Sequence, residues 1–274
     1  MKVLITGVLG YVGSGLLDLI PESEGLDRHP GSSFQSCISD FKIPAGVETV
    51  IHLADRRLEE LNAENLEHNI SLHEKFIRQL EQHPSIKRVI FSSSCSVYGY
   101  QSGELTEESS VMATSFYAKS KLAVENLLQT SSLPYVICRF GTAFGVSQPM
   151  RWDLLPNAMG KHICNKEPIE LYDPNSMRPY THVSDIRRGL VFALERAPLR
   201  SVLNFAGENV SKTDLLDQIS SSLQKRPLRV DINTDKKDVR HYCVSSKAVC
   251  SQGFSFQNSI QSEFSRWKEI YAKN

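Results

Sequence analysis

A tyrosine and a lysine stand at a spacing that could handle a proton. Tyr117 and Lys121 are four residues apart in Y-A-K-S-K, so a helix over about 115–129 would place both on one face. A free tyrosine, with a pKa near ~10, is a poor base at neutral pH, and a nearby ammonium favours its phenolate. Lys121 could also hold a nicotinamide ribose. The alternative interpretation is a surface lysine beside a packed tyrosine.

Hydroxyl groups follow an apolar run upstream of this pair. Residues 91–99 read FSSSCSVYG, directly after the predicted strand over 89–91. Hydroxyls at the carboxyl end of a strand can hydrogen-bond a substrate oxygen and share a proton with a phenol. A serine-rich turn without chemistry is the alternative for this segment alone. The glycine turn described next precedes this segment in the sequence and the tyrosine–lysine pair follows it, and the three elements in this order are more specific than any one of them.

The third element is a glycine turn directly after the first predicted strand. Gly7, Gly10 and Gly13 have the spacing G-x-x-G-x-x-G, with Tyr11 and Val12 between the last two. Glycines allow a tight turn and let backbone N–H groups approach a pyrophosphate. A helix beginning there would add a partial positive charge. The position predicts dinucleotide binding, against a plain glycine-rich turn.

An acidic residue at the end of the second strand would bind the adenosine ribose. Asp27 is the candidate, and its closeness to Gly13 requires a short first helix or a short second strand. Its carboxylate repels a 2′-phosphate and favours NAD. Arg28 could attract that phosphate, so NADP stays possible.

Short apolar runs alternate with helical patterns, which predicts an α/β fold with a Rossmann-type, doubly wound parallel sheet. The strands are expected at 3–5, 50–53, 89–91 and 135–138, and one long helix should present Leu66, Ile70, Phe76, Ile77 and Leu80 on one face. We expect residues 1–145 plus about 180–207 to form the NAD(P)-binding domain. Residues of about 146–179 plus 208–274 would form a small C-terminal substrate lobe over the carboxyl ends of the strands.

Composition excludes several other classes of protein. The 274 residues carry 31 basic and 31 acidic side chains, so there is no general attraction to nucleic acid. The six cysteines form no C-x-x-C pair, which argues against a zinc site and against a disulfide framework. No apolar stretch approaches ~18 residues, and we expect no membrane association and a cytoplasmic location.

With these residues in view, the sequence resembles the extended short-chain dehydrogenase/reductase family, in particular its nucleotide-sugar epimerases, dehydratases and reductases. The resemblance extends to VIHLA at 50–54, to RPYTHVSD at 178–185 and to the stretches DVR at 238–240 and SSK at 245–247. It implies a homodimer that acts on a nucleotide-diphosphate sugar. The implied catalytic residues are Ser94, Tyr117 and Lys121, with Ser96 as a second hydroxyl. The implied cofactor contacts are the glycine turn, Asp27, Arg28, Asp40, Leu53, Ala54, Asn69, Tyr117 and Lys121. The implied substrate contacts are Ser94, Thr142, Arg178, Asp238 and Arg240.

Some positions depart from the family pattern. Cys95 and Ser96 stand where dehydratases of this family carry an Asp-Glu pair, and loss of water from a sugar needs an acid and a base there. Dehydration is therefore disfavoured, and Cys95 is interpreted as structural. Thr142 replaces an asparagine that is common in relatives. Asp55 occupies a position where a small residue is usual, and nothing in the sequence explains it.

Three functions fit these residues. The first is an NAD-dependent nucleotide-sugar 4-epimerase, which returns hydride to the opposite face of the sugar. The second is an NAD(P)H-dependent reductase of a nucleotide-linked 4-keto sugar. The third is a non-enzymatic regulator that senses the dinucleotide, which the intact set of Ser94, Tyr117 and Lys121 disfavours.

Overall fold

The computed structural model describes residues 2–28, 31–56, 60–236 and 238–271. In that part of the chain, one parallel sheet forms the centre of the fold, with strand order β11-β7-β5-β4-β1-β2-β3. These strands are β1 (Lys2–Thr6), β2 (Ser23–Asp27), β3 (Phe34–Gln35), β4 (Val47–His52), β5 (Arg88–Ser94), β7 (Tyr135–Phe140) and β11 (Ser201–Phe205). The order reverses direction between β1 and β4, as in a doubly wound sheet. The predicted Rossmann-type fold is confirmed.

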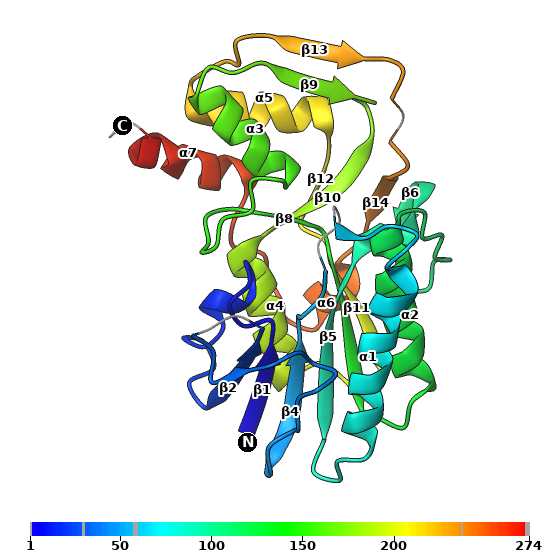
Figure 1. Ribbon diagram of the computed structural model, residues 1–274. Coiled ribbons are helices and arrows are strands. Elements are labelled where there is room, and N and C mark those ends of the chain that lie inside the picture. Colours follow the sequence, from blue (N-terminus) through cyan, green and yellow to red (C-terminus); the bar gives the residue numbers. More distant parts are fainter. Residues whose placement is uncertain (1, 29–30, 57–59, 237, 272–274) are drawn as a thin grey trace.

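Helices cover both faces of this sheet (Figure 1). On one face lie α1 (Leu66–Glu81) and α2 (Phe116–Thr130), whose buried side chains share an apolar cluster with β4, β5 and β7. On the other face lies α4 (Val183–Glu195), which packs into a second cluster with β1 and β7. The central strands β1, β4, β5 and β7 are therefore covered on both sides, which explains why each contains a short apolar run.

The expected helix after the glycine turn is much reduced. The structure has a 3-10 helix of three residues, Gly13–Gly15, followed by turns up to Leu19. Two glycines in three positions oppose an α-helix, and β2 already begins at Ser23. Of the two alternatives, a short first helix or a short second strand, the structure confirms the short helix. The partial positive charge expected from a helix that begins at the turn has no α-helix to supply it.

The long helix α1 also departs from its predicted face. Phe76, Ile77 and Leu80 are buried as expected, whereas Leu66 and Ile70 are only half-buried. In the first half of α1 the buried positions are the polar Asn69 and His73. The helix therefore presents its apolar end to the core and its polar end to the carboxyl edge of the sheet.

A second group of elements lies above the carboxyl ends of the strands (Figure 1). It contains α3 (Leu155–Cys164), α5 (Lys212–Leu223), α7 (Ile260–Tyr271) and the paired strands β9 (Ile169–Tyr172) and β13 (Val230–Asn233). We call this group the upper lobe. The side chain of Ser211 accepts a hydrogen bond from the backbone of Asp214 and caps α5. The upper lobe has its own core, in which Met159, Leu215, Phe264 and Trp267 pack together.

Shorter strands connect the two parts. One small sheet contains β8 (Thr142–Phe144), β10 (Met177–His182) and β12 (Glu208–Ser211), and another pairs β6 (Tyr100–Leu105) with β14 (His241–Val244). α6 (Lys247–Ser251) packs near β11. No helix among the described residues is both long and apolar enough to cross a membrane.

A buried carboxylate stabilises the upper lobe. Glu263 on α7 accepts hydrogen bonds from the backbone of Val146 at 2.9 Å and from the Trp267 indole at 3.0 Å, and it lies 3.1 Å from His182. Burial alone would raise the pKa of Glu263, but the hydrogen bond and charge of His182 and the other two donors lower it to about 2. A carboxyl whose pKa is lowered by folding stabilises the folded state. This contribution is fully present when the pH is above 4.5, the pKa in the unfolded chain, and it is lost as the pH falls toward 2.

We therefore expect Glu263→Gln to reduce the free energy of unfolding at pH 7 by about 2 kcal/mol, a value discounted for partial solvent screening. Urea denaturation at pH 7 and at pH 3 should show a smaller difference between wild type and variant at the lower pH. Glu195→Gln is the control, because Glu195 is exposed on α4 and should change stability by less than about 0.5 kcal/mol. An equal difference at both pH values would contradict the assignment.

Candidate active site

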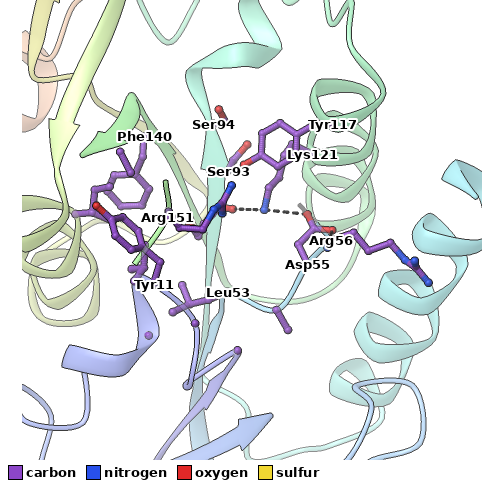
Figure 2. Close-up of a pocket in the computed structure, with 18 of the residues that line it drawn as sticks. Tyr11, Leu53, Asp55, Arg56, Ser93, Ser94, Tyr117, Lys121, Phe140 and Arg151 are labelled. Carbon is purple, nitrogen blue, oxygen red and sulfur yellow. Dashed lines mark hydrogen bonds and ion pairs between the residues drawn. The ribbon is translucent and has the colours of Figure 1, made fainter. Parts of the chain in front are cut away.

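One cavity of about 470 Å³ lies at the carboxyl ends of the strands and is also lined by Arg151 and Leu154, just before α3 of the upper lobe. Most of the sequence-predicted site residues meet there. Figure 2 shows Tyr11, Ser94, Tyr117 and Lys121 around this space, contributed by the glycine turn, β5 and α2. The predicted residues that line the cavity are Gly7, Gly10, Tyr11, Val12, Gly13, Asp27, Arg28, Leu53, Ala54, Asn69, Ser94, Ser96, Tyr117, Lys121, Thr142 and Arg240.

Tyr117 and Lys121 lie on consecutive turns of α2. The helix begins after Ser115, whose side chain accepts a hydrogen bond from the backbone of Ala118. The Lys121 ammonium is buried, donates to the backbone carbonyl of Ser92 at 2.8 Å and lies 5.6 Å from the centre of the Tyr117 ring. The ammonium is therefore close enough to the phenol to influence its charge.

The serine-rich segment lines the same cavity as Tyr117 and Lys121. Ser94 ends β5, and its hydroxyl accepts a hydrogen bond from the backbone of Ser96 at 3.1 Å. The Ser96 hydroxyl lines the cavity and is buried without a hydrogen-bond partner among the described residues. A buried polar group of this kind needs a partner, which a bound ligand can supply. Cys95 points away from the cavity into a buried cluster, which agrees with its structural interpretation.

The three glycines of the turn have different tasks. Gly7 has φ +70°, and an added Cβ would lie 2.8 Å from the backbone of Ala54. A Cβ on Gly13 would lie 2.3 Å from the carbonyl oxygen of Gly7, so Gly13 is required by the turn itself. A Cβ on Gly10 would approach only that oxygen, at 3.1 Å, and the rest of a side chain would extend toward the cavity. The cradle therefore fits a pyrophosphate that passes over Gly10.

Asp27 stands at the end of β2, as the sequence predicts. Its carboxylate accepts a hydrogen bond from the backbone of Leu9 at 3.0 Å, inside the glycine turn. Arg28 follows it and also lines the cavity, with its side chain exposed. The Tyr11 hydroxyl donates to the carbonyl of Gly145 and thereby ties the glycine turn to the segment that enters the upper lobe.

Three predicted contacts lie elsewhere. Asp40 is exposed and does not line the cavity, although Ser36, Cys37 and Ile38 just before it do. Arg178 and Asp238 are buried beside the cavity as an ion pair, and the Lys212 ammonium lies 2.7 Å from the same carboxylate. The guanidinium of Arg240 pairs with Asp238 as well, at 3.4 Å, so three cations share this carboxylate, and of the three only Arg240 lines the cavity.

Sequence reasoning missed several residues of this site. Arg56, His73, Arg151 and Tyr242 line the cavity without belonging to a recognised motif. Arg151 is placed among the cavity residues in Figure 2, and its guanidinium donates to Asp153 at 2.7 Å. The proline-rich stretch around Arg151 has no periodicity from which its orientation could be read. His73 could have been found from its position four residues after Asn69, which places both side chains on one face of α1.

Asp55, which the sequence left unexplained, is a central member of the site. Its side chain is only 6% exposed and lies 3.0 Å from the Lys121 ammonium. Asn69 donates to its other oxygen at 2.9 Å. Lys121 therefore forms an ion pair with Asp55, and Figure 2 marks this contact.

Comparisons with known proteins agree with this geometry. The chain is 26% identical over 237 residues to an uncharacterized UDP-glucose epimerase of Bacillus subtilis (strain 168), YtcB, with 73% of this chain and 74% of that protein covered. It is 23% identical to dTDP-4-dehydro-6-deoxyglucose reductase of Escherichia coli, over 82% of each chain. Among solved structures, MoeE5 in complex with UDP-glucuronic acid and NAD superimposes with a TM-score of 0.85 at 25% identity, covering 100% of this chain and 99% of that one.

The family model for the NAD dependent epimerase/dehydratase family matches residues 3–204. That span contains the glycine turn, the serine-rich segment and the Tyr117–Lys121 pair. This chain belongs to the NAD dependent epimerase/dehydratase family.

Proposed function

We propose that this protein is an NAD-dependent 4-epimerase of a nucleotide-linked hexose. The observation that carries the proposal is the convergence of Ser94, Tyr117 and Lys121 on the cavity that the glycine turn also lines. NAD, when bound there, supplies a reversible hydride acceptor for the C4 carbon of the sugar. Gly10 and Asp27 would hold its pyrophosphate and adenosine ribose.

The residues of this chain supply the proton chemistry. Tyr117, as phenolate, takes the proton from the O4 hydroxyl of the sugar and returns it to the same oxygen after the sugar has turned. Ser94 donates a hydrogen bond to O4 and keeps it beside the phenol. Lys121 supports the phenolate by its charge. No net oxidation or reduction of the cofactor results from one full cycle.

We assign the anionic end of the substrate to the arginine side of the cavity. Arg240 and Arg151 both line it, and a guanidinium matches a phosphate or carboxylate group well. Arg178 would act indirectly in this assignment, by fixing Asp238, which accepts a hydrogen bond from the backbone of Arg240 at 3.0 Å. Thr142 lies on the same side, at the start of β8. The homodimer and the cytoplasmic location stay predictions.

A panel of nucleotide sugars tests the proposal. UDP-glucose, UDP-glucuronic acid and their C4 epimers are incubated separately with the purified protein without added NAD(P)H, while NMR follows the sugar and absorbance follows reduced nicotinamide. We expect a mixture of both C4 epimers from one member of the panel, with no accumulation of reduced nicotinamide beyond the enzyme concentration.

The second candidate is a reductase of a nucleotide-linked 4-keto sugar, which the likeness to the Escherichia coli reductase favours. Tyr117 and Lys121 would serve that reaction equally well, with Tyr117 giving a proton to O4. The two functions differ in cofactor balance. Stoichiometric consumption of NADPH with a 4-keto sugar, and no epimer from any 4-hydroxy sugar, would establish the reductase.

A further inference from the structure

A buried chain of polar side chains leads from the sheet to the lysine of the site. The Thr6 hydroxyl lies 2.7 Å from Nδ1 of His52, and Nε2 of His52 lies 2.9 Å from Nδ1 of His73. Nε2 of His73 lies 3.2 Å from one oxygen of Asp55, whose other oxygen lies 3.0 Å from the Lys121 ammonium. These side chains come from β1, β4, the segment after β4, α1 and α2.

The partners fix the direction of every hydrogen bond in this chain. The Thr6 oxygen accepts from the two backbone N–H groups that follow His52, at 3.2 and 3.1 Å, so its own hydrogen is donated to His52. His52 must then carry its proton on Nε2 and donate to His73, which in turn donates from Nε2 to Asp55. Both imidazoles are neutral in this assignment, and burial lowers the pKa of His52 well below its usual value.

Asp55 is the ionised member of this hydrogen-bonded network. Its Oδ1 accepts from His73, from the Asn69 amide at 2.9 Å and from the backbone of Arg56 at 2.7 Å. Burial alone would raise the pKa of Asp55, but the charge of Lys121 and these donors hold it well below the usual range. Burial alone would lower the pKa of Lys121, and Asp55 raises it instead. Both groups are therefore charged, and Tyr117 and Glu125 also favour the charged form of Lys121.

This arrangement changes what the lysine can do for the tyrosine. The Lys121 ammonium lies 5.6 Å from the Tyr117 ring centre and favours the phenolate, while a carboxylate 3.0 Å from the ammonium offsets part of that charge. This network of side chains ends inside the protein at Thr6, which is fully buried, so that end anchors Asp55 and does not lead to solvent. The carboxylate thus has a fixed place and a fixed charge.

We propose that Asp55 is a positioning residue that holds the Lys121 ammonium against the Ser92 carbonyl and, through its charge, sets the pH at which Tyr117 loses its proton. The use of that proton in catalysis rests on the function proposed above. The titration of Tyr117 itself does not depend on it.

The surroundings contain few other charges that could dominate this effect. Glu125 on α2 is the second carboxylate near Lys121, but it is paired with Arg139 at 2.7 Å. Other titratable or charged groups also face Tyr117, Lys121 or Asp55, or line the cavity with them. Among the described residues they are His52 on β4, His73 on α1, Arg56 after β4, Asp27 at the end of β2, Arg28 after it, Cys37 after β3, Tyr11 in the glycine turn, Arg151 before α3, and Arg240 and Tyr242 at or near β14.

Tyrosine labelled with ¹³C at the ring carbon that bears the hydroxyl tests the proposal without substrate or added cofactor. NMR spectra of the full chain are recorded across the alkaline range, and the Tyr117 signal is assigned by its absence in Tyr117→Phe. We expect the titration midpoint of Tyr117 to lie lower in Asp55→Asn than in wild type, by about one pH unit. Asp55→Ala, which introduces a small residue, should shift the midpoint in the same direction and serves as the second variant should the first fail to fold.

Asp185→Asn is the matched control. Asp185 is a buried carboxylate on α4 that accepts hydrogen bonds from the backbone of residues 257 and 258, so its loss should lower stability and leave the Tyr117 midpoint unchanged. A midpoint that stays in place or rises in both Asp55 variants, or that shifts equally in Asp185→Asn, would overturn the proposal. A failed epimerase assay would leave this titration result standing, so the two proposals can fail separately.

Discussion

Replacing Tyr117 by phenylalanine should reduce turnover by about 10²–10⁴-fold, the usual contribution of a general acid–base group. The change removes one hydroxyl and little volume from a half-buried residue on α2, so the helix and the dinucleotide site should persist. The proton on O4 of the sugar would then lose its acceptor beside Lys121. Steady-state kinetics on the epimerised sugar measures the loss in kcat, and calorimetry with NAD checks that cofactor binding is retained.

Tyr135→Phe is the control for this substitution. Tyr135 is buried at the start of β7, at the end of the strand opposite to the cavity, and it undergoes the same chemical change. Its variant should turn over at the rate of wild type. Turnover of Tyr117→Phe within a few-fold of wild type would remove Tyr117 from the proposed mechanism.

The parts of the site that could be predicted are those encoded within one segment. Tyr117 and Lys121 share a helix, and the glycine turn occupies seven consecutive residues, so spacing alone places their members together. The strands β1, β4, β5 and β7 were also predictable, because residues buried on both faces of a parallel sheet read as apolar runs, whereas β3 and β11 were not predicted. The order of these segments then indicated a common cavity at the carboxyl edge.

The pairing of Asp55 with Lys121 lay beyond such reasoning. Asp55 follows β4 and Lys121 lies on α2, and they meet only because β4 and β5 are neighbours and α2 packs over β5. His73 joins them from α1 at a position where periodicity favours an apolar residue. A buried polar residue is acceptable there because Asp55 and His52 satisfy both of its ring nitrogens.

The fate of Arg178 illustrates the same limit. The resemblance to the family implies that Arg178 contacts the substrate, but Asp238 lies sixty residues later in the sequence and pairs with it. The same carboxylate also lies 2.7 Å from the Lys212 ammonium and 3.4 Å from Arg240, so three cations from distant segments gather on one buried acid. Such a cluster cannot be read from the local sequence around Arg178.

Replacing Gly10 by valine should abolish dinucleotide binding while the fold is retained. Gly10 lines the cavity, and an added Cβ would meet only the carbonyl oxygen of Gly7, at 3.1 Å. The branched side chain would therefore extend into the space where a pyrophosphate passes over the turn. Calorimetric titration with NAD measures the loss, and urea denaturation should give a stability close to that of wild type.

Gly13→Ala provides the contrast within the same turn. Its Cβ would lie 2.3 Å from the carbonyl oxygen of Gly7, and that contact is made by the protein itself, so the turn must shift whether or not a ligand is present. We expect this variant to lose stability before any effect on binding can be separated from it. Gly10→Val therefore tests ligand binding, whereas Gly13→Ala tests the packing of the turn itself. Normal NAD affinity in Gly10→Val would show that the pyrophosphate lies elsewhere, and the assignment of the glycine turn would then be wrong.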